Sequence, residues 1–115
     1  MNGKYVSLIT YKKDGSPIAT QVWFAEEDKN MYIVTLQGRY KFKRIKNNLN
    51  VQIAPASMRG KPKGEYFDGI ARILSDDEAQ PIIGLFKKKY RMFKMMFKED
   101  REGEKKSFFI EITLK

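Results

Sequence analysis

The side chains best suited to chemistry lie between residues 31 and 64, a stretch that contains no Asp or Glu and eight Lys and Arg residues. Its strand-like part ends at Thr35, and a turn follows at Gly38. A helical pattern then begins with the cations Arg39, Lys41 and Arg44. Free amides at a helix N-terminus, a hydroxyl and several cations together bind phosphate well. The arrangement predicts a phosphate-binding site, with a solvated basic helix face as the alternative interpretation.

Several other kinds of chemistry are excluded by what the chain lacks. Its 115 residues include no cysteine and no histidine. Disulfides, thiolate metal sites, cysteine nucleophiles and histidine acid–base catalysis are therefore absent, and we expect no metal site. The carboxylates Glu26, Glu27, Glu65 and Asp68 show no spacing typical of an acid–base pair, so no catalytic side chain is assigned.

The formal net charge of +9 favours a polyanionic partner. Nucleic acid, an anionic membrane and a phosphorylated small molecule all fit that charge. The N-terminal residues do not form a signal sequence, and no apolar stretch approaches the roughly 20 residues of a membrane span. We therefore expect a cytoplasmic protein that has no membrane partner.

The elements that must position the cations form one domain, residues 1–115, as the length suggests. Runs rich in β-branched and aromatic residues, bounded by turn residues, predict strands. They cover residues 4–12, 18–25, 31–35, 49–56, 65–74 and 107–114. Six short strands and two helices predict a mainly β, α+β antiparallel barrel whose interior is filled by side chains.

Two helical patterns interrupt the strands. In the first, Tyr40, Phe42, Ile45 and Leu49 are spaced like one helix face. The second opens with Ser75-Asp-Asp-Glu78, the spacing of a capping box. Its apolar stripe is expected to run as far as Phe97. Pro81 is expected to kink this helix or to delay its start.

Two ordered motifs carry a family resemblance. The first is Lys-Asp-Gly-x-Pro-x-x-x-x-Val-Trp-Phe-Ala, residues 13–25. The second is Thr-x-x-Gly-x-x-Lys, residues 35–41, followed by Ile-x-Asn-Asn-x-x-Val, residues 45–51. In this order they resemble the split β-barrel family of pyridoxamine phosphate oxidase-like flavoproteins. Within it the chain is most similar to the small branch that depends on the deazaflavin coenzyme F-420.

The resemblance implies a homodimer with a cofactor, coenzyme F-420 or FMN, in each of two clefts at the subunit interface. By position, Thr35 and Lys41 match the phosphate-binding hydroxyl and lysine, and Val34 matches a strand residue beside the cofactor. The strand Gln21-Val22-Trp23 matches the one that runs along the ring system. Arg39 and Tyr40 occupy the two positions at which the oxidase pattern has Ser and Arg, so the chain departs from the pattern there. Met92, Met95 and Met96 are residues that we expect a two-fold partner to cover.

A bound ring would carry the redox chemistry, so the resemblance implies an oxidoreductase that transfers hydride to or from a small organic substrate. Vitamin B6 oxidation is disfavoured, because Ala19 and Phe24 stand where the oxidase pattern has Arg and Lys. One alternative is a nucleic-acid-binding barrel in which Tyr40, Phe42 or Tyr66 stacks on bases. Another is a cofactor carrier without turnover. For Trp23, core packing is the alternative to a cofactor-binding role.

The surplus of cations favours coenzyme F-420 over FMN. Coenzyme F-420 carries a phosphodiester and a tail of several glutamates, whereas FMN carries one terminal phosphate. The cations beyond the Lys41 site that could bind such a tail are Lys43, Arg44, Arg59, Lys61 and Lys63. General lysine enrichment, seen also at residues 87–89, is the alternative explanation.

Overall fold

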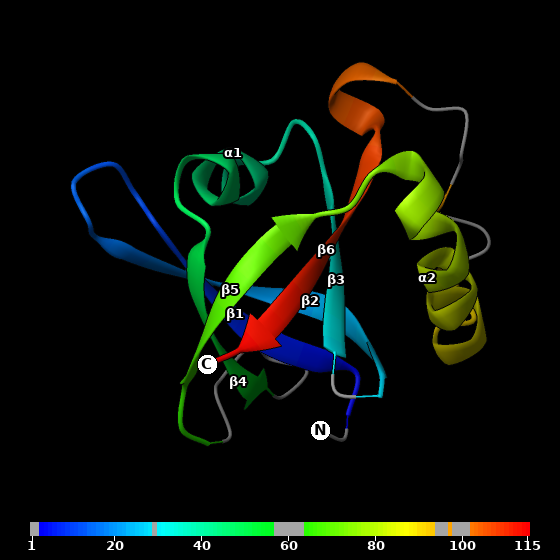
Figure 1. The fold of residues 1–115 in the computed structure, drawn as a ribbon, viewed down its shortest axis with the longest axis horizontal. Coiled ribbons are helices and arrows are strands. Elements are labelled where there is room, and N and C mark those ends of the chain that lie inside the picture. Colours follow the sequence, from blue (N-terminus) through cyan, green and yellow to red (C-terminus); the bar gives the residue numbers. More distant parts are fainter. Residues whose placement is uncertain (1–2, 29, 57–63, 94–96, 98–101) are drawn as a thin grey trace.

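Six antiparallel strands form a closed barrel in the order β1-β2-β3-β6-β5-β4 (Figure 1). The computed structural model describes residues 3–28, 30–56, 64–93, 97 and 102–115. The antiparallel, mainly β barrel with two helices is confirmed, while the homodimer stays a prediction. The strands are β1 (Tyr5–Tyr11), β2 (Pro17–Glu27), β3 (Asn30–Leu36), β4 (Asn50–Ala56), β5 (Phe67–Ile73) and β6 (Ser107–Leu114).

Side chains fill the barrel, because alternate residues of each strand point inward. The interior cluster includes Leu8, Phe24 and Ile33. Helix α1 (Tyr40–Asn47) adds Phe42 and Ile45 to this cluster and covers one end of the barrel (Figure 1). Of the four residues predicted to form the apolar face of this helix, Phe42 and Ile45 are buried. Tyr40 and Leu49 are exposed, because Tyr40 is the first helical residue and Leu49 lies beyond the helix.

Strands β2 and β3 are paired over only part of their lengths. Their ladder runs from Phe24–Ile33 to Glu27–Asn30. Before Phe24, β2 pairs only with β1, and after Ile33, β3 pairs only with β6, as far as the described residues show. The two strands therefore separate beyond the Phe24–Ile33 pair, and this leaves a gap between them in the barrel wall.

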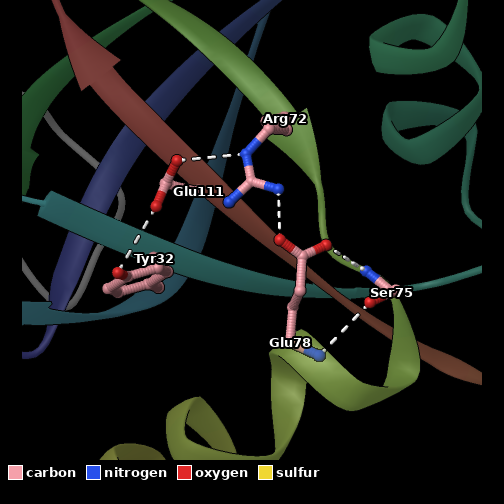
Figure 2. A network of polar contacts seen from close by, with 5 residues as sticks. All are labelled: Tyr32, Arg72, Ser75, Glu78 and Glu111. Carbon is pink, nitrogen blue, oxygen red and sulfur yellow. Dashed lines mark hydrogen bonds and ion pairs between the residues drawn. The ribbon is translucent and has the colours of Figure 1, made fainter.

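Helix α2 (Asp76–Lys89) begins at the predicted capping box. The Ser75 hydroxyl accepts from the Glu78 amide at 3.2 Å, and the Ser75 amide donates to the Glu78 carboxylate at 3.1 Å (Figure 2). The predicted delay at Pro81 does not occur, because these bonds secure the first turn upstream of the proline. The helix also ends earlier than predicted. Tyr90 adopts an extended backbone, although Phe93 and Phe97 continue the apolar packing.

Glu78 also anchors the start of α2 to the barrel (Figure 2). Its carboxylate pairs with Arg72 of β5, whose Nε donates to Glu111 of β6 at 3.2 Å. Glu111 in turn accepts from the Tyr32 hydroxyl of β3 at 3.5 Å. The Arg72 side chain is about half exposed, and exposed ion pairs stabilise little. We infer that this network sets the position of α2 more than it adds stability.

The buried Tyr90 hydroxyl joins the end of α2 to the barrel. It accepts from the Phe24 amide at 3.0 Å. It lies 2.6 Å from the Lys4 carbonyl and 2.7 Å from the Phe24 carbonyl, and its single proton is donated to one of them. Burial raises the pKa of Tyr90 to about 12. The chain beyond α2 is thereby held against the start of β1 and the middle of β2.

We predict that Tyr90→Phe lowers the free energy of unfolding by about 1–3 kcal/mol, because the Phe24 amide and the carbonyls lose a buried partner. Urea denaturation measures this change. Tyr40→Phe is the control, since Tyr40 is 76% exposed. Because the folded-state pKa lies above the ordinary 10.0, the parent should lose stability as pH rises from 10 towards 12. Equal stability of Tyr90→Phe and Tyr40→Phe would contradict the assigned role.

Candidate functional site

A cavity of about 200 Å³ lies where β2 and β3 part; we call it the seam cavity. Its walls are mostly apolar and come from β2, β3, the start of β6 and the segment after α2. Backbone edges of the two strands that lack a strand partner also face this gap, and unpaired backbone groups seek partners. The lining residues are Trp23, Val34, Thr35, Leu36, Phe93, Phe97 and Ser107.

Three of the predicted cofactor-binding residues meet at this cavity. Trp23 and Val34 pack with the outer apolar cluster beneath α2. Thr35 is the next residue along β3 and, by strand alternation, shares the inward face with Ile33. The cavity therefore borders an apolar outer wall at Trp23 and Val34 and also reaches Thr35, whose side chain belongs to the inward face of β3. Apolar walls with a few polar groups suit a planar ring with a polar edge.

Thr35 is 4% exposed, and its hydroxyl oxygen is buried. Its Oγ1 has no hydrogen-bond partner among the described residues. The Thr20 hydroxyl of β2 is in the same condition. An unsatisfied buried polar group costs about 1–3 kcal/mol. The two unpartnered hydroxyls thus lie on the two strands that part, as expected of groups kept for a ligand.

Thr20 was not among the predicted site residues. The signal was available, because Thr20 lies two residues from both Ile18 and Val22 and so shares their inward face of β2. A third inward hydroxyl, that of Thr10, differs from both: it accepts from Arg44 Nε at 2.7 Å. This bond directs Arg44 towards β1, so Arg44 does not line the seam cavity.

The predicted phosphate lysine, Lys41, is a half-buried cation without a carboxylate partner in the described part of the chain. Burial lowers its pKa, and the charges of Arg39 and Arg44 lower it further. No acidic side chain lies in the first turn of α1, and the Arg39 side chain does not cap the helix. The start of α1 therefore favours an anion electrostatically. Neither Lys41 nor Arg39 borders the seam cavity itself.

Two more predicted residues have limited access. The Val22 side chain is buried in the barrel core, so it faces away from the outer wall. Gln21 is partly exposed on β2 opposite Ser7. Phe42 cannot stack on nucleic-acid bases as the alternative interpretation suggested, because it is buried. Its ring stacks on that of Phe108, with the centroids 4.6 Å apart. Arg59, Lys61, Lys63, Met95 and Met96 lie outside the described residues.

Trp23 packs against the protein and also borders the seam cavity, while its cofactor-binding role stays a prediction. Its ring stacks on Tyr90 with centroids 4.5 Å apart and planes 8° apart. The side chain nevertheless stays partly exposed and borders the seam cavity. Packing against Tyr90 therefore fixes the ring orientation at the cavity wall.

The seam cavity contains no titratable side chain among its described lining residues. No group of three or more potential metal-ligating side chains is found in the described residues. Within the same residues, no helix has the length and hydropathy needed to cross a membrane. What the cavity offers is shape, an apolar wall and hydroxyls, together with cations on the following helix.

The model of the pyridoxamine 5'-phosphate oxidase family matches residues 2–115. No curated protein sequence shows significant similarity. Among solved structures, an F-420 reductase is 19% identical, with a TM-score of 0.64 over 97% of this chain and 86% of that one. A pyridoxamine 5'-phosphate oxidase-related, FMN-binding protein from Nostoc punctiforme is 14% identical, with a TM-score of 0.64 over 96% and 70%. The heme storage protein HutZ from Vibrio cholerae is 13% identical, with a TM-score of 0.72 over 97% and 82%. At these identities the structures show a shared fold.

We predict opposite effects from the same substitution at two inward threonines. Thr35→Val removes an unpartnered hydroxyl and should keep or raise the free energy of unfolding, by up to about 1 kcal/mol. Thr10→Val removes the acceptor of Arg44 and should cost about 1.5–3 kcal/mol, the value of a hydrogen bond to a charged group. Chemical denaturation compares the two. A loss at Thr35 as large as that at Thr10 would show that the Thr35 hydroxyl is already satisfied.

Proposed function

The chain belongs to the pyridoxamine 5'-phosphate oxidase family, and on that premise we propose that it binds coenzyme F-420 or FMN in the seam cavity. The observation that carries this proposal is the unpartnered, buried hydroxyl of Thr35 beside an apolar cavity between parted strands. The names of structural neighbours, an F-420 reductase and an FMN-binding protein, support the same class of cofactor.

The residues present fit a flavin-type group in two respects. Val34 and Trp23 would hold its flat ring, and Thr35 would hydrogen-bond a polar atom. Lys41 would balance the phosphate charge, with Arg39 adding to the positive potential at the start of α1. A bound anion would counter both the burial and the repulsion by Arg39 and Arg44, which together lower the pKa of Lys41.

When bound, such a group would supply hydride transfer, to or from a small organic substrate. This chain's own part would be to bind and orient the ring and to exclude water with Trp23, Phe93 and Phe97. Proton transfer would fall to solvent or substrate, because no titratable side chain lines the described cavity. Vitamin B6 oxidation is not proposed: at the two departing positions Ala19 is exposed and Phe24 is fully buried.

The size of the cavity supports a homodimer. About 200 Å³ lies below the range of roughly 300–1,000 Å³ typical of small-molecule sites, so one chain supplies only one wall. A two-fold partner would enclose the rest of the cofactor. Met92, which is 61% exposed in the single chain, would be covered by that partner. We further propose a cytoplasmic location, in keeping with the absence of cysteine.

A non-catalytic carrier is the second candidate function. The absence of a titratable side chain from the described cavity wall favours it, and a heme storage protein shares the fold. Multiple turnovers of cofactor with an added electron acceptor would exclude the carrier, whereas tight binding without turnover would favour it. Nucleic acid is disfavoured as a partner, since Phe42 is buried.

We predict that coenzyme F-420 binds more tightly than FMN and that its affinity falls more steeply with salt. The reason is the glutamate tail, which the surplus cations Lys43 and Arg44 would contact through screened ionic interactions. Spectroscopic titrations of both cofactors at two ionic strengths measure this. Tighter binding of FMN, with a shallower salt dependence for the deazaflavin, would make FMN the ligand.

Lys41→Ala is expected to weaken cofactor binding by about 1.5–3 kcal/mol, the worth of a charge-assisted hydrogen bond, or roughly ten- to hundredfold. Thr35→Val should cost less, because its hydroxyl is neutral. Lys43→Ala is the control of equal charge, as Lys43 is exposed on the same helix. Equal affinities of the Lys41 and Lys43 variants would reduce the helix to a solvated basic face.

Light scattering at micromolar concentration should give about twice the chain mass of 13.5 kDa. A monomer would contradict both the dimer and the shared enclosure of the cofactor. The same sample with and without cofactor separates an assembly that precedes binding from one that binding induces.

A further inference from the structure

A second hollow, of about 280 Å³, borders the stacked Trp23–Tyr90 pair; we call it the basic pocket. It is formed where the chain enters β1 and where it leaves α2. Trp23 is the residue that it shares with the seam cavity. The lining residues are Lys4, Tyr5, Trp23, Lys89, Tyr90, Arg91 and Met92.

The charge of the basic pocket is of one sign. Three of its described lining residues, Lys4, Lys89 and Arg91, are cations, and none of the described lining residues is an acid. Exposed surfaces usually mix both signs, so a hollow with three cations favours an anion. Among the described residues, Glu26 of β2 acts on Lys89; burial lowers the pKa of this lysine, and Glu26 raises it by a smaller amount.

Lys89 is held in place by aromatic rings. Its Nζ lies 3.4 Å from the centroid of Phe24 and 5.5 Å from that of Tyr90. No ion pair joins Lys89 to a carboxylate in the described part of the chain. Cation–π contacts orient an ammonium group without neutralising it. A partly buried positive charge, with Glu26 as an acidic neighbour, is therefore presented at this pocket, whereas the adjacent Lys88 is exposed.

The walls beside these cations are aromatic and rigid. Trp23 and Tyr90 stack in nearly parallel planes, and the Tyr90 hydroxyl is fixed by backbone groups of β2 and of the residue before β1. Rings that are held in this way offer flat contact area at little entropic cost. The volume lies just under the usual range for ligand sites, which limits the occupant to a small molecule.

We propose that the basic pocket binds a small organic anion made of one flat ring and a carboxylate or phosphate group. The ring packs against Tyr5 and the Trp23–Tyr90 pair, and the anionic group meets Lys89 and Arg91. The site is separate from the seam cavity and does not require a flavin to be bound there. General lysine enrichment does not account for it, because the cations converge on one hollow with aromatic walls.

Trp23, the single tryptophan of the chain, supplies a direct readout. Its fluorescence is followed as benzoate, benzamide or acetate is added to the full chain without added cofactor, with calorimetry as a second measurement. Benzamide has nearly the shape of benzoate without its charge, and acetate has the charge without the ring. We expect benzoate to bind at least about tenfold more tightly than either, as a charge-assisted contact and a ring contact each contribute.

Substitutions locate the binding. Lys89→Met keeps an unbranched side chain and removes the charge that lies over Phe24, and Arg91→Gln removes a charge from an exposed side chain. Each should weaken benzoate binding about tenfold, while Lys88→Met, the matched control, should leave it unchanged. Arg91→Gln keeps the test decisive should Lys89→Met fail to fold.

Two results would overturn the proposal: equal affinities for benzoate and benzamide, or equal affinities of the Arg91→Gln and Lys88→Met variants. The benzoate titration uses no cofactor, so its result would still hold if neither coenzyme F-420 nor FMN bound in the seam cavity. Conversely, a failure of benzoate to bind would leave the seam cavity unaffected.

Discussion

The parting of β2 from β3 above the Phe24–Ile33 pair is the constraint on which the candidate site depends. A barrel of this size fills its interior with side chains, so a ligand must bind in its wall or outside it. Where the two strands part, each keeps one strand partner among the described residues, and their edges face a gap. Thr20 and Thr35, whose buried hydroxyls have no partner among the described residues, lie on these strands. The same local opening thus creates space, unpaired polar groups and a wall that suits the proposed ligand.

The aromatic residues around Trp23 determine the shape of that wall. Tyr90 ends α2, hydrogen-bonds the backbone of Phe24 and stacks on Trp23. One side chain therefore links the end of a helix, the barrel and the residue that borders both hollows. Because the Tyr90 ring is held by these hydrogen bonds and by the stack, it keeps Trp23 in one orientation. A binding wall built in this way is preorganised, which reduces the entropy lost on binding.

Sequence patterns predicted the strands closely because strand alternation and turn residues are local properties. The last strand has the predicted bounds, and the capping box at Ser75 forms as predicted. The end of α2 was missed because it depends on Tyr90 meeting Trp23, a contact remote in sequence. For the same reason the bond between Arg44 and Thr10 could not be predicted. Trp23, Val34 and Thr35, which the motifs singled out, line one cavity, and their cofactor-binding role stays a prediction. Thr20 becomes a candidate only once the strands are known to part.

A crystal structure of the protein with coenzyme F-420 or FMN tests the central claim most directly. The account predicts a ring against Val34 and Trp23, a cofactor oxygen within hydrogen-bond distance of the Thr35 hydroxyl, and a phosphate at the Lys41 side chain. A cofactor bound elsewhere, with the Thr35 hydroxyl still unpartnered, would contradict it.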